Sequence, residues 1–196
     1  MGGVIRFKEW YWRNIPATLL EKMVGVRDLS FSYHLETSEE QKQKWYRWLA
    51  SLKYLTQLKL SERFSLFTTP SEECVKSLKT LKLEDYRQLP TALHFTKLES
   101  LSIGMGYPCS TNRPMVIFRG KRIPSLPTTL TSLCVSVNHI FYRDHVTGLV
   151  NLTRLKLKSP FRGNEDFPLV LPLLTNLRKL HLSVKEINLS PEQLSP

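Results

Sequence analysis

Apolar residues recur along this chain in short segments, in which spacings of three residues are followed by one spacing of two residues. Three segments follow the full pattern L-x-x-L-x-x-L-x-L: residues 52–60 (LKYLTQLKL), 149–157 (LVNLTRLKL) and 174–182 (LTNLRKLHL). Four segments carry a shorter form with the same ending: residues 26–31 (VRDLSF), 78–83 (LKTLKL), 98–103 (LESLSI) and 130–135 (LTSLCV). The two apolar residues that flank one other residue at the end of each segment predict a strand, because alternate side chains of a strand point to the same face.

These segments recur along the chain at nearly regular intervals. The first apolar residue of each final pair stands at positions 29, 58, 81, 101, 133, 155 and 180, and all but one of the steps lie between 20 and 29 residues. Leucines three apart would also suit a set of unrelated amphipathic helices. The strand-like ending and the regular return favour a structural repeat instead.

Over roughly residues 20–185 the chain resembles the leucine-rich repeat family. The resemblance implies an α/β fold, namely a curved horseshoe solenoid with a parallel sheet on its concave face and short helices and loops on its convex face. Residues 1–20 are then expected to form an N-terminal cap, residues 21–189 an array of about seven repeats, and residues 190–196 a C-terminal cap or a truncated repeat. The family is defined by its scaffold, so the resemblance leaves function open.

Between the predicted strands, two helices and one long loop are expected. The segment Ser38-Glu39-Glu40-Gln41 resembles a capping box, and apolar residues at helical spacing follow it up to residue 52. Residues 69–72 (TPSE) predict a second helix start, and the Pro-containing segments 89–93 and 126–130 predict turns. The long step spans the loop 104–122, which is a tolerated insertion or a second site with these members: Arg113, Phe118, Arg119, Lys121 and Arg122.

Charge and cysteine content narrow the functional classes. The formal net charge is +11, which favours an acidic protein, nucleic acid or an anionic lipid surface as partner. Three widely spaced cysteines predict neither a disulfide framework nor a zinc site, and they favour a reducing compartment. The first 16 residues lack the apolar core of a signal peptide, and no apolar run is long enough to span a bilayer. A cytoplasmic or nuclear protein, not secreted by a classical signal, is expected.

Motifs of catalysis are missing from the sequence. It contains no P-loop, no zinc-protease motif, no nucleophile elbow and no dinucleotide fingerprint. Cys134 should face outward from its strand, but the neighbouring repeats would place Ser102 and Lys156 beside it rather than a histidine and an acid. The sequence therefore predicts a protein that is not an enzyme and needs no cofactor or metal.

The residue between the two apolar residues of each strand should point onto the concave face. These residues and their outward neighbours are small and polar in the middle of the array and basic at its end, and aromatic residues are absent, which disfavours single-stranded nucleic acid. We expect a monomeric module that binds an acidic or phosphorylated protein through these residues: Lys59, Lys82, Arg154, Lys156, Lys158, Lys179 and His181. A solubilising role for the lysines is the alternative, as are nucleic-acid or anionic-lipid binding and substrate recognition in a ubiquitin ligase. The aromatic residues at 10–12 are interpreted as a hydrophobic cap or as interface anchors.

Overall fold

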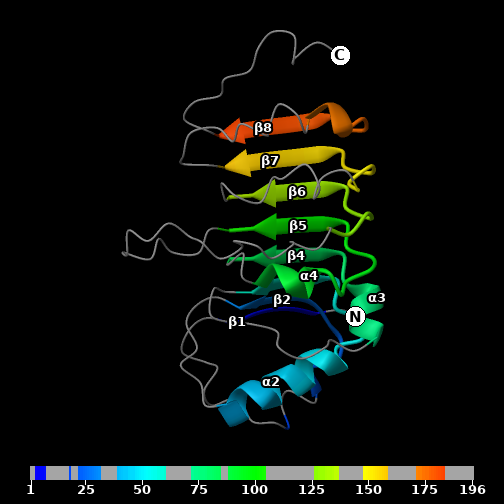
Figure 1. The fold of residues 1–196 in the computed structure, drawn as a ribbon. Helices are drawn as coiled ribbons and strands as arrows, with labels where there is room; N and C mark the ends of the chain where they lie inside the picture. Colours follow the sequence, from blue (N-terminus) through cyan, green and yellow to red (C-terminus); the bar gives the residue numbers. More distant parts are fainter. Residues whose placement is uncertain are drawn as a thin grey trace.

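The computed structural model describes residues 3–7, 18, 22–31, 39–60, 72–84, 88–104, 126–136, 148–158 and 171–183. Within these ranges, one open parallel sheet contains eight strands that follow each other in chain order (Figure 1). The strands are β1 (Gly3–Phe7), β2 (Val26–Phe31), β3 (Gln57–Leu60), β4 (Thr80–Leu83), β5 (Ser100–Ile103), β6 (Ser132–Val135), β7 (Arg154–Lys158) and β8 (Lys179–Ser183). Short helices stand between some of them: α2 (Glu39–Ser51), α3 (Glu72–Ser77), α4 (Leu89–Ala92) and the 3-10 helix η2 (Leu171–Leu173). The architecture is α/β.

The register of the sheet aligns equivalent positions of successive segments. Leu58 pairs with Leu81, Leu81 with Leu101, and the same phase continues through β6, β7 and β8. From β3 to β7 each strand therefore contributes two apolar side chains to the same face, and all of them are buried. The prediction of a strand at each of these seven positions is confirmed, and the predicted buried apolar face is confirmed for β3 to β7.

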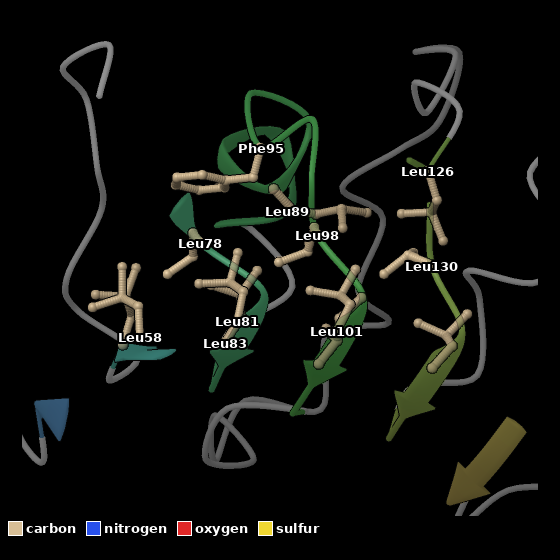
Figure 2. Close-up of a cluster of buried hydrophobic side chains, with 14 of the residues drawn as sticks. Leu58, Leu78, Leu81, Leu83, Leu89, Phe95, Leu98, Leu101, Leu126 and Leu130 are labelled. Carbon is tan, nitrogen blue, oxygen red and sulfur yellow. The ribbon is translucent and has the colours of Figure 1, made fainter. Parts of the chain in front are cut away.

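Tight turns before the strands explain the three-residue spacing of the leucines. The backbone NH of Leu152 donates to the carbonyl of Leu149 at 3.0 Å, and the NH of Leu177 donates to the carbonyl of Leu174 at 2.9 Å. Such a bond between residues three apart turns both side chains to the same side of the chain. Phe95 occupies the equivalent position before Leu98, is fully buried and belongs to the same core cluster as Leu78, Leu89 and Leu98 (Figure 2).

Hydrogen bonds between consecutive turns hold the segments in phase. The carbonyl of Thr131 accepts bonds from the NH groups of Thr153 and Arg154, at 2.9 and 3.0 Å, and from the hydroxyl of Thr153 at 3.0 Å. A side chain adds a similar bond between the turns that precede β7 and β8: the amide of Asn176 donates to the carbonyl of Val150 at 2.7 Å. Each segment thus satisfies the backbone groups of its neighbour, which makes the stacking directional as well as hydrophobic.

The structure adds one strand that the sequence pattern did not predict. β1 lies in the segment that was expected to be an N-terminal cap, and Ile5 pairs with Leu29 of β2. Ile5 and Phe7 flank one residue in the same way as the strand leucines, so the signal was present in a shorter form. The remaining residues of the expected cap, apart from Thr18, lie outside the described ranges, as do residues 190–196.

The helices agree with the predictions in part. α2 begins at Glu39, directly after Ser38 of the predicted capping box, and buries Trp48 and Leu49, as its helical spacing predicted. α3 begins at Glu72, at the end of the predicted start. Residues 89–92 form α4, where only a turn was expected, because Leu89 and Ala92 lie one helical turn apart and are both buried against the core.

The last described strand departs from the expectation that both apolar residues point into a core. Leu180 is 40% exposed, whereas its register partner Leu155 is 1% exposed. Leu155 lies between two strands, and β8 has a partner on one side only within the described residues. The motif sets the direction of the side chain, and a following strand is needed to bury it.

Candidate functional site

The face of the sheet opposite the leucines carries polar side chains, and we call it the open face. It is formed by the residues that alternate with the leucines along β2 to β8. In the first row, Gln57 pairs with Thr80, Thr80 with Ser100, Ser100 with Ser132, Ser132 with Arg154 and Arg154 with Lys179. In the second row the register aligns Ser30, Lys59, Lys82, Ser102, Cys134, Lys156 and His181.

The C-terminal end of the open face carries a basic cluster from two adjacent strands. Its members are Arg154, Lys156, Lys158, Lys179 and His181. Arg154 is in register with Lys179, and Lys156 with His181, so each pair is separated by one strand spacing of about 4.8 Å. All members except the half-buried Lys156 are exposed. The structure therefore brings together five of the seven predicted residues.

Within the described residues no carboxylate forms an ion pair with any member of the basic cluster. Like charges on adjacent strands repel each other, and the repulsion is relieved by solvent ions or by an anionic partner. Arg154 can offer paired NH donors to a carboxylate or phosphate, whereas the lysines act as mobile point charges. Chemically, the cluster can hold anionic groups but offers no general base or nucleophile of its own besides His181.

The N-terminal end of the open face is electrically balanced. Lys59 forms an ion pair with Glu84 at 2.7 Å, directly after β4, so this predicted site residue already has an anionic partner. Lys82 is exposed and forms no ion pair with a described carboxylate. A shallow hollow of about 280 Å³ lies here, and its lining mixes both charges: Asp28, Ser30, Gln57, Leu58, Lys59, Thr80 and Lys82. The hollow and the ion pair were not predicted from the sequence, although Glu84 directly follows a recognisable strand segment.

Between the two ends the open face is uncharged. β5 presents Ser100 and Ser102, and β6 presents Ser132 and Cys134, all of them half-buried. The register places Cys134 between Ser102 and Lys156, which is the neighbourhood that the sequence predicted. No histidine or acid therefore stands beside this thiol in its row.

The other cysteine of the described residues is buried in α3. Burial raises the pKa of the Cys74 thiol to about 11, so the thiol is protonated at neutral pH and is a poor nucleophile. On the surface of the same helix, a hydrogen bond and ion pair with Lys76 lower the pKa of Glu72 and raise that of Lys76. Both features belong to the scaffold and lie away from the basic cluster.

Metal binding and membrane spanning find no support in the described ranges. In the part of the chain that the structure describes, no three residues among His, Cys, Asp and Glu are grouped so that they could hold a metal ion. Nor does any helix there combine the length and the apolar character required to cross a bilayer. The predicted loop site, Arg113, Phe118, Arg119, Lys121 and Arg122, lies outside the described residues.

The chain was compared with known proteins at three levels. No family model, no curated protein and no solved structure matches it. The fold and the charges of its own residues are thus the basis for any statement about function.

Proposed function

We propose that this chain is a leucine-rich repeat solenoid that acts as a non-catalytic binding module. Three features support the repeat architecture: the parallel sheet with equivalent positions in register, the recurring turns before the strands, and the buried leucines aligned across neighbouring strands. A repeat sheet exposes a broad, nearly regular face, which suits the binding of a macromolecule better than the enclosure of a small substrate.

In this proposal the partner is an acidic or phosphorylated protein, and the basic cluster is its docking site. The observation that carries the proposal is the alignment of Arg154 with Lys179 and of Lys156 with His181, without an ion-paired carboxylate among the described residues. Five basic side chains on two strands concentrate positive potential at one end of an otherwise nearly neutral face. The open face offers no described aromatic side chain for stacking on bases, which favours a protein over single-stranded nucleic acid.

The proposal is tested by reversing two charges of the cluster. The probe is a fluorescein-labelled peptide with a block of four glutamates, and its binding is followed by fluorescence anisotropy. We expect the double variant Lys156→Glu/Lys158→Glu to weaken binding about tenfold or more, which corresponds to about 1.4 kcal/mol. The melting temperature should not fall, because Lys158 is exposed and reversal relieves repulsion within the cluster.

A matched control separates a site from a general effect of net charge. The double variant Lys53→Glu/Lys97→Glu makes the same change in charge at exposed positions in two turns before strands, away from the open face. Its affinity for the peptide should stay within about twofold of the parent protein, since distant charges are screened at physiological salt. Equal losses in both double variants, or no loss in either, would contradict the proposal.

A further inference from the structure

Lys82 is a second cationic position on the open face, separate from the basic cluster. It projects from β4, is exposed, and has no ion pair with a described carboxylate. Its neighbour Lys59 differs in this respect because Glu84 neutralises it at 2.7 Å. Among the described side chains at the N-terminal end of the face, Lys82 is therefore a cation whose charge is available to a partner.

The described side chains of the open face between Lys82 and the basic cluster, on β5 and β6, are short and uncharged. A partner that lies across the strands would meet Ser102 and Cys134 in the row that joins Lys82 to Lys156. Both side chains are short and half-buried, so the main chain of a partner can approach the sheet there. Charged groups of a partner would find no counterpart on β5 or β6 within the described residues.

The register fixes the separation of the two cationic positions. Lys82, Ser102, Cys134 and Lys156 stand in one row on four consecutive strands. Three strand spacings of about 4.8 Å place the ends of this row about 14 Å apart. An extended chain advances about 3.3–3.6 Å per residue, so this separation corresponds to four residues.

We propose that the open face binds an extended acidic protein segment that crosses the strands from β8 to β4. A block of carboxylates occupies the basic cluster, three uncharged residues pass over β6 and β5, and a further carboxylate reaches Lys82. This inference rests on the proposed function and adds the extended conformation and the charge spacing of the partner. The footprint ends at β4, because Asp28 and the Glu84–Lys59 pair make the next strands unfavourable for further acids.

The test uses three labelled peptides and two single variants. The first peptide has a block of four glutamates alone, the second has a further pair of glutamates after three Gly/Ser residues, and the third has all six glutamates in one block. We expect the second peptide to bind the parent protein about two- to five-fold more tightly than the first, as one additional exposed ion pair allows. The Lys82→Gln variant should lose this gain and keep the affinity for the first peptide.

The controls distinguish failure of this inference from failure of the proposed function. Lys53→Gln removes the same charge from a turn and should keep the gain. A gain that survives in Lys82→Gln, or an equal gain for the third peptide in which the spacing is absent, would overturn the spaced segment while leaving the basic cluster as the docking site. If the first peptide binds no better than an uncharged one, the proposed function is wrong and this inference fails with it.

Discussion

Leu101 and Leu180 occupy the same place in the repeat but differ in what covers them, and truncating each to alanine measures that difference. Leu101 is 1% exposed and lies in register between Leu81 and Leu133. Leu180 is 40% exposed and has Leu155 on one side only within the described sheet. We expect Leu101→Ala to lower the free energy of unfolding much more than Leu180→Ala.

The magnitudes follow from the buried carbon atoms. Removing three carbons at about 0.8 kcal/mol each costs about 2.4 kcal/mol of transfer free energy when the side chain is fully buried. A cavity between two packed strands adds to this, so Leu101→Ala should cost about 3–4 kcal/mol. At position 180 only about three fifths of the transfer term applies and solvent fills the space, which leaves about 1.5 kcal/mol.

Urea unfolding followed by far-ultraviolet circular dichroism provides the comparison. The slope of the free energy against urea concentration must be the same in both variants, so that a change in midpoint reports stability alone. Equal losses for the two variants would contradict this prediction, since they would mean that the position in the motif sets the loss of stability and the covering strand does not.

Two further predictions concern a glycine and a buried thiol. A β-carbon at Gly104 would lie 3.1 Å from the carbonyl oxygen of Glu84, so Gly104→Ala should destabilise the protein by about 1–3 kcal/mol. A β-carbon at Gly148 would have its nearest contact 3.8 Å away, so Gly148→Ala should be neutral or slightly stabilising. Thermal melts of the two variants measure the difference. The opposite order would contradict the contact. Burial raises the pKa of Cys74 from 9.0 to about 11, so the protonated thiol contributes stability below pH 9 that is lost as the pH rises toward 11. Cys74→Ala should remove this part of the alkaline destabilisation, amounting to about 2 kcal/mol, and an unchanged pH dependence between pH 8 and 11 would show that the thiol does not contribute.

Much of the sheet could be predicted from the alternation of apolar and polar residues. A one-residue shift of any strand would turn its leucines to solvent, so the pattern specifies both the strand and its inward face. β1 was missed because Gly2 stands three residues before Ile5, where the other strand segments have a leucine or a valine. α4 was missed because a short Pro-containing segment with two apolar residues suits a turn and a helix equally.

The alternation of residues along the chain is enough to assign side chains to the core face or to the opposite face of the sheet, because strand geometry makes that choice with a period of two residues. The sequence by itself also determined that the positive charges gather near the end of the array. Only the tertiary structure decided which residues stand beside each other across strands: it joins Lys59 to Glu84, leaves Lys82 without a described carboxylate, and brings Arg154 beside Lys179. These side-chain neighbours are set by the register of the strands and by contacts between residues more than 20 positions apart, which cannot be predicted from the spacing of nearby residues.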